Sequence, residues 1–273
     1  MRVRLRFSKL GRLRWTSHRD VARVWERALR RARLPVAYSA GFSPHPLVSF
    51  GLALPTGSES VAEYLDVTLA EDVEPATLAE RLAPGLPTGI AVMAAASLGQ
   101  GAASLQQEVT ACTWEIDVPD VTPAELSEAS ARLLAADSLP IRRMRKGRME
   151  VDDIRPSVRV LTTRAAEGSA GSVLDCEVGT RPRGVRPTDL QDALGLPLGL
   201  ARRTSQWIER DGSRWEPLPA DAATAAGAGR VVTSSRRDSH VGPHTRALAR
   251  GVLGRAAGTT APREHTPEHL ARR

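Results

Sequence analysis

The first residues of the chain alternate between charged and apolar side chains. Arg2, Arg4 and Arg6 would face solvent or a ligand, while the apolar residues between them would face a core. This period of two predicts a half-buried strand. Further along, from about His18 to Arg33, apolar residues recur at helical spacing, which predicts an amphipathic helix.

The predicted helix has a capping sequence and a well-defined apolar face. Ser17 is a good N-cap residue, and the carboxylate of Asp20 would oppose the helix dipole in the first turn. Trp25 shares the apolar face with Val21 and Leu29. We therefore expect the indole ring in the core and not on the surface as a platform for stacking bases.

The pattern continues through the first 100 residues. Strands are predicted at residues 36–39, 47–54, 61–69 and 90–96, with a helix at residues 75–83. Together with the first strand and helix, and with the short strand at residues 36–39 set aside, the order is strand, helix, strand, strand, helix, strand. This order is that of the ferredoxin-like split βαβ unit.

A second unit of the same kind is predicted after a Gly/Ala/Ser joint. Its strands are expected at residues 108–118, 139–145, 157–163, 173–178 and 200–209, and its helices at residues 123–136 and 187–194. The fold class predicted is therefore α+β, with tandem ferredoxin-like domains at residues 1–100 and 105–218. Residues 219–273 are rich in Ala, Gly and Arg and poor in large apolar side chains, which predicts a disordered tail. We expect residues 1–218 to fold without it.

The stretch from Tyr38 to Pro46 predicts a rigid loop between two strands. Gly41 can take a positive φ, and two prolines stiffen the backbone. Phe42 and His45 would then be presented by a stiff scaffold, which suits a binding site. The alternative is that Phe42 plugs the sheet edge and His45 caps a turn.

Positive charge is concentrated at the N-terminus. The chain has a net charge of +7, but residues 1–33 alone hold twelve basic residues against two acids, a net charge of +10. Opposite the apolar face of the first helix lie the arginines Arg19, Arg23, Arg27, Arg30 and Arg31. Such a stripe is either a solvated helix face or a surface that binds a polyanion.

The residue types also limit the chemistry. Cys112 and Cys176 are far apart, with no C-x-x-C pair, so we expect no disulfide framework, no zinc site and no iron–sulfur cluster. No glycine-rich nucleotide motif, signal peptide or membrane span is found, so a cytoplasmic protein without cofactors is expected. Asp152 and Asp153 are carboxylates of the kind that bind a metal ion, but pairing of one of them with Arg155, or capping of a turn, is favoured.

Several short strings of the chain form a combined signature. They are Phe7-Ser8-Lys9, Gly11-Arg12-Leu13, Ser17-His18-Arg19-Asp20, the loop Tyr38–Pro46, Gly57-Ser58-Glu59-Ser60, Arg145-Lys146-Gly147 and Val151-Asp152-Asp153-Ile154-Arg155-Pro156. Over residues 1 to about 210 the chain resembles the radical-SAM-associated domain family of unknown function, in its stand-alone form. The resemblance implies a separate radical SAM enzyme as partner, because this chain lacks the three cysteines that hold such a cluster. Tandem ferredoxin-like domains are also similar, in fold alone, to endoribonucleases that process CRISPR repeats.

These observations favour a non-catalytic accessory module that binds RNA or positions a substrate for a radical SAM enzyme, in RNA modification or processing. The residues expected to contact nucleic acid are Arg19, Arg23, Arg27, Arg30, Tyr38, Phe42, His45, Lys146 and Arg155. One alternative is a metal-independent endoribonuclease in which His18 and His45 act as base and acid. Another is a protein-binding adaptor that does not contact RNA.

Overall fold

The computed structural model describes residues 1–99, 101–168 and 170–218, and its main feature is one large mixed sheet. Seven strands run in the order β4-β1-β3-β10-β5-β9-β8, with β2 added to β3 and β11 added to β10. The protein is therefore α+β, with few helices. Residues 1–100 and 105–218, predicted as two domains, both contribute strands to this sheet.

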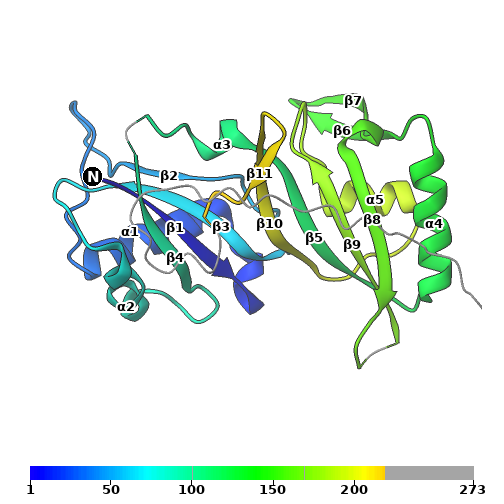
Figure 1. Cartoon of the computed structure of the whole chain (residues 1–273), viewed down its shortest axis with the longest axis horizontal. Coiled ribbons are helices and arrows are strands. Elements are labelled where there is room, and N and C mark those ends of the chain that lie inside the picture. The colour runs from blue at the N-terminus through cyan, green and yellow to red at the C-terminus, as the bar shows by residue number, and fades with distance from the viewer. Residues whose placement is uncertain (100, 169, 219–273) are drawn as a thin grey trace, which may run out of the picture. The chain divides into compact units, whose positions relative to one another are not determined.

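The first group of elements forms one end of the sheet (Figure 1). They are β1 (Arg2–Lys9), α1 (His18–Arg31), β2 (Val48–Phe50), β3 (Glu59–Thr68), α2 (Leu78–Leu82) and β4 (Val92–Leu98). Their strands lie in the order β4-β1-β3-β2, with every neighbouring pair antiparallel. The buried face of α1 packs in a core with side chains of β1 and α2.

The second group repeats this order with an insertion. It consists of α3 (Leu105–Glu108), β5 (Val109–Pro119), α4 (Pro123–Ala135), β6 (Pro140–Arg145), β7 (Arg148–Asp153), β8 (Val158–Ala165), β9 (Gly171–Gly179), α5 (Pro187–Leu194), β10 (Ala201–Arg210) and β11 (Ser213–Trp215). The order β10-β5-β9-β8 is again antiparallel throughout. The strand predicted at residues 139–145 does not join this sheet. It pairs with β7, which the sequence reading missed, in a separate two-stranded hairpin.

The two groups of strands meet where β3 and β10 run parallel. Arg202 and Arg203 of β10 lie opposite Glu59 and Ser60 at the start of β3. Arg203 is 2% exposed and donates two hydrogen bonds to Glu63, at 2.6 and 3.1 Å. A buried ion pair therefore lies at the junction.

The expectation that β1 is half-buried is wrong, because both of its faces are covered. Arg4 and Arg6 are 4% and 5% exposed. Arg4 pairs with Asp66 at 2.8 Å, and Arg6 pairs with Glu216 at 2.8 Å. The guanidinium groups of Arg4 and Arg6 therefore pair with carboxylates inside the fold and do not face solvent or a ligand.

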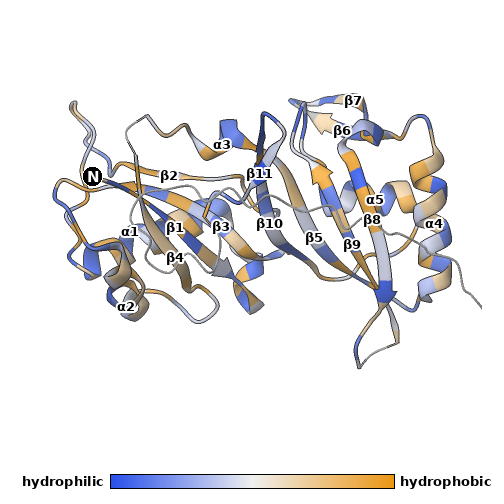
Figure 2. Cartoon of the chain, in the orientation of Figure 1, coloured by the Kyte–Doolittle hydropathy of each residue, from blue (hydrophilic) through white to orange (hydrophobic). Residues whose placement is uncertain are grey.

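The predicted burial of Trp25 is confirmed, whereas one predicted strand is much shorter in the structure. Trp25 is fully buried and packs edge-to-face against Phe7, with ring centroids 4.9 Å apart. The strand predicted at residues 36–39 is reduced to two isolated bridges, from Val36 to Leu69 and from Tyr38 to Pro46. Apolar and polar residues are mixed along the strands of both groups, as the periodicity required (Figure 2).

The predicted tail, residues 219–273, lies outside the described residues. Within the part of the chain that the structure does describe, no helix has the length and apolar character needed to cross a bilayer.

Candidate nucleic-acid interface

The exposed face of α1 carries the arginines that the sequence singled out. At about 100° per residue they fall within an arc of roughly 80° on the side opposite Trp25. They are Arg19, Arg23, Arg27 and Arg30, all of them exposed. The prediction of a basic stripe opposite a buried face is confirmed as geometry; its role stays a prediction.

The start of α1 is capped as predicted. The amide of Asp20 donates to the hydroxyl of Ser17 at 3.2 Å, and that hydroxyl donates back to the Asp20 carboxylate at 2.7 Å. The hydrogen bond from Ser17 and the nearby Arg23 guanidinium lower the pKa of Asp20. Arg23 is thereby partly neutralised, at 3.1 Å from Asp20, whereas Arg27 and Arg30 have no ion pair within the described residues.

The loop from Tyr38 to Pro46 is closed by hydrogen bonds at its base. We call this base, residues 38–39 and 45–46, the neck of the loop. The Ser39 amide donates to the His45 carbonyl at 2.9 Å, and Tyr38 and Pro46 form an antiparallel bridge. Gly41 has φ of +123°, the left-handed region that its lack of a Cβ permits. The base of the loop is therefore closed by hydrogen bonds, and the stiffness of its tip stays a prediction.

Phe42 lies at the tip of this loop with its side chain fully exposed. It does not plug the sheet edge, so that part of the alternative is wrong. An exposed aromatic ring on a pinned loop loses little conformational freedom when it stacks on a ligand. The arrangement is therefore suited to stacking on an unpaired base.

The two histidines have different surroundings. Nδ1 of His45 lies 2.8 Å from the Ser39 hydroxyl, which ties the ring to its own loop. The His18 ring packs edge-to-face on Phe50, with centroids 5.2 Å apart. In the described chain no hydrogen bond or ring contact joins the two imidazoles, so the structure does not assemble them as an acid–base pair.

Beside His18 is a small cavity of about 20 Å³, which is room for about one water molecule. It is lined in part by Lys9 and Glu63. The ammonium of Lys9 donates to the carbonyls of Arg14 and Thr16, at 3.3 and 2.9 Å, and burial lowers its pKa. Lys9 therefore fastens the segment before α1 to the sheet.

A larger groove of about 250 Å³ lies between the second half of α1 and the neck of the loop. The residues lining it are Glu26, Leu29, Arg30, Leu34, Pro35, Val36, Tyr38 and Pro46. The fold thus brings together Arg30 and Tyr38, two residues that the sequence selected for separate reasons. It adds Glu26, which was not among the residues expected to bind, although its position four residues before Arg30 places both on one side of the helix.

In the second group of elements, Lys146 and Arg155 have different roles. Lys146 is exposed at the tip of the β6–β7 hairpin, where it and Gly147 have φ of 45° and 77° in a two-residue turn. Arg155 instead donates to the carbonyls of Leu134 at 2.7 Å and Ala136 at 3.1 Å, at the C-terminal end of α4. Its donors are committed to the fold, and we leave it out of the proposed surface.

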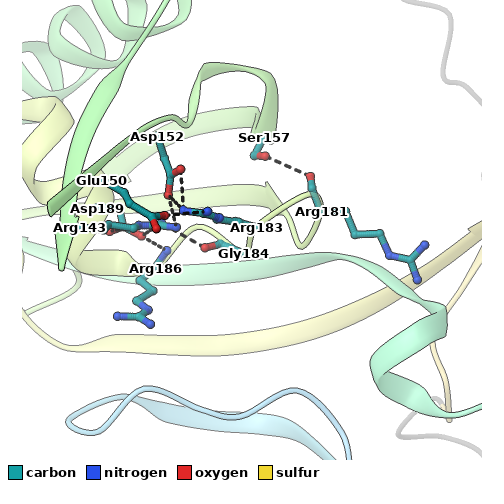
Figure 3. A network of polar contacts seen from close by, with 9 residues as sticks. All are labelled: Arg143, Glu150, Asp152, Ser157, Arg181, Arg183, Gly184, Arg186 and Asp189. Carbon is teal, nitrogen blue, oxygen red and sulfur yellow. Dashed lines mark hydrogen bonds and ion pairs between the residues drawn. The ribbon is translucent and has the colours of Figure 1, made fainter. Parts of the chain in front are cut away.

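The acids near Arg155 are also structural. Arg183 pairs with Asp152 at 2.5 Å and with Glu150 at 2.9 Å, and Arg143 pairs with Asp189 in the same network (Figure 3). This network fastens the β6–β7 hairpin to the segment before α5. Asp153 accepts hydrogen bonds from the amides of Leu139 and Arg155, and no group of His, Cys, Asp or Glu in the described residues is arranged to hold a metal ion.

The protein is thus of the α+β class, with one large mixed sheet, a basic helix and a loop that exposes an aromatic side chain. The chain belongs to a family described as an uncharacterized protein conserved in bacteria, DUF2344, whose model matches residues 2–187. The match includes α1, the Tyr38–Pro46 loop and the β6–β7 hairpin. Comparison with curated proteins finds no match.

Proposed function

We propose that this protein is a non-catalytic accessory module that binds single-stranded or looped RNA through α1 and the Tyr38–Pro46 loop. The observation that carries the proposal is the basic face of α1 beside a groove that ends at the neck of the Phe42 loop. Arginine binds phosphate through paired hydrogen bonds, and an exposed aromatic ring stacks on an unpaired base. The arginines of α1 would therefore bind phosphates of an RNA strand, and Phe42 in the loop would stack on one of its bases.

Two further features belong to the same proposal. Each group of strands has the order of a split βαβ unit, which supports a pair of ferredoxin-like halves. The partner would be a separate radical SAM enzyme, as the family resemblance implies. This chain would position RNA for that enzyme, since its own two cysteines are both buried and too few to hold a cluster.

The test is a salt titration of RNA affinity by fluorescence anisotropy, with a labelled single-stranded oligouridine as probe. We expect affinity to fall steeply with salt, because each phosphate neutralised releases condensed counterions. Replacing Arg23 and Arg27 by glutamate should weaken binding and flatten the slope of log affinity against log salt by about 1 to 2. A variant with Arg132→Glu and Arg210→Glu, two exposed arginines on other elements, carries the same change in net charge and should behave like the wild type.

The loop is tested separately. Phe42→Ala should lower affinity while leaving the salt slope nearly unchanged, because an uncharged ring releases no counterion. Its thermal stability should match that of the wild type, since the ring packs against nothing in the fold. Equal affinity and slope in the wild type and in both the arginine and Phe42 variants would refute the proposed surface.

The same samples distinguish the other functions. Cleavage of the bound RNA, lost in His18→Ala and in His45→Ala, would indicate the endoribonuclease instead of the accessory module. Absence of RNA binding, together with stoichiometric recovery of a protein lacking a radical SAM cluster motif, would indicate the adaptor. Recovery of a radical SAM enzyme with the tagged chain would support the proposed partnership.

A further inference from the structure

We propose that the groove between α1 and the loop neck is a subsite for one nucleobase, and that it selects guanine. This inference rests on the proposed RNA-binding function and adds a sequence preference to it. The volume of about 250 Å³ is slightly below the range of roughly 300–1,000 Å³ typical of sites for drug-sized ligands. A single planar group suits such a groove better than a longer ligand.

The lining of the groove combines apolar surface with two opposite charges. Leu29 and Leu34, 2% and 8% exposed, provide apolar surface, and the Tyr38 ring, 55% exposed, lies beside it. Glu26 and Arg30 supply the charges from successive turns of α1. An aromatic ring and aliphatic side chains accommodate the face of a base, while charged groups bind its edge.

Glu26 and Arg30 are both available to a ligand. Residues four apart on a helix with opposite charges commonly pair, yet no ion pair joins these two, and Glu26 makes no hydrogen bond to any part of the chain that the structure describes. Arg132 and Glu128 of α4, which are also four residues apart, do form an ion pair, at 2.7 Å. The groove therefore presents a carboxylate and a guanidinium that do not neutralise each other directly.

Guanine is the base whose edges complement this pair. Its N1–H and N2–H₂ groups are adjacent donors, which match the two acceptor oxygens of the Glu26 carboxylate. Its O6 and N7 atoms are adjacent acceptors, which match the donor fork of Arg30. Adenine has no pair of adjacent donors, and cytosine and uracil offer at most one donor beside an acceptor.

The experiment measures base preference at constant salt. The probes are labelled oligouridine strands of about 12 nucleotides with one central guanosine, inosine or adenosine. We expect the wild type to bind the guanosine strand at least about fivefold more tightly than the adenosine strand, with inosine between them because it lacks the N2 amino group. In Glu26→Gln the preference should fall to near unity, whereas Glu80→Gln, the same charge change at an exposed position on α2, should retain it.

The outcomes separate the subsite from the function on which it rests. Salt-dependent binding of all strands with equal affinity would overturn the guanine subsite and leave the RNA-binding proposal standing. A guanosine preference that survives Glu26→Gln would also overturn it, because another part of the protein would then read the base. If no strand binds at any salt concentration, both proposals fail.

Discussion

The buried ion pair between Arg203 and Glu63 permits a quantitative test of how the two groups of strands are held together. Nη2 of Arg203 lies 2.6 Å from the Glu63 carboxylate and also donates to the carbonyl of Leu52 at 2.9 Å. The guanidinium stacks on Trp114, 5.4 Å from the ring centroid. Replacing Arg203 by methionine keeps an apolar stem against that ring and leaves the Glu63 carboxylate buried without its partner.

The expected cost follows from this geometry. Removing one member of a buried pair destabilises a protein by about 3–5 kcal/mol, because the remaining charge is left uncompensated. For a domain of roughly 150–250 residues, each kcal/mol lowers Tm by about 2–4 °C, so we expect a drop of about 6–20 °C. The assay is urea and thermal unfolding followed by circular dichroism.

A second substitution tests the mechanism. In Arg203→Met, changing Glu63 to glutamine removes the stranded charge, so the double variant should recover at least about half of the lost stability. Arg132→Met breaks an exposed helical pair with Glu128 and should cost less than about 0.5 kcal/mol. The reasoning is refuted if Arg203→Met costs less than about 1 kcal/mol, or if the double variant is less stable than the single one.

Three further outcomes concern the core, the helix cap and the C-terminal end of the described chain. Trp25→Ala should cost about 3–5 kcal/mol in urea unfolding, because it empties a fully buried site; a nearly unchanged Tm would contradict this. Ser17→Ala should cost about 0.5–2 kcal/mol, whereas Ser43→Ala in the exposed loop should cost almost nothing, and equal losses would argue against the cap. A chain ending at residue 222 should unfold cooperatively, while one ending at residue 215 should be less stable because it loses the contacts of Arg6 with Glu216 and with the Leu218 carbonyl. Equal midpoints for the two truncations would show that these contacts do not contribute.

Several parts of the fold follow from sequence patterns because they depend on neighbouring residues. The helix predicted from His18 to Arg33 forms as α1, since its apolar spacing and the Ser17 cap act within a few turns. Gly41 takes its positive φ for an equally local reason. The basic face of α1 could also be read in advance, because helical periodicity places the arginines opposite Trp25.

The β6–β7 hairpin shows where a local pattern was ambiguous. Residues 139–145 do form a strand, but nothing in their own sequence indicates whether they join the large sheet or pair with β7. The structure resolves this through the ion pairs of Arg143 and Arg183, whose partners include Asp189 in α5. An alternating stretch specifies an extended conformation, and its pairing depends on which neighbours the rest of the chain supplies.

The charged residues of β1 and β10 show what tertiary structure alone decided. The alternation at the N-terminus determined an extended strand with arginines on one face, but not what would cover that face. Arg6 pairs with Glu216, which is 210 residues away in the sequence, and Arg203 pairs with Glu63, which is 140 residues away. The groove of Glu26 and Arg30 likewise exists because the Tyr38–Pro46 loop folds back beside α1. A buried charge is tolerated only where a partner compensates for the loss of solvent, and which distant residue becomes that partner is decided by the assembled sheet.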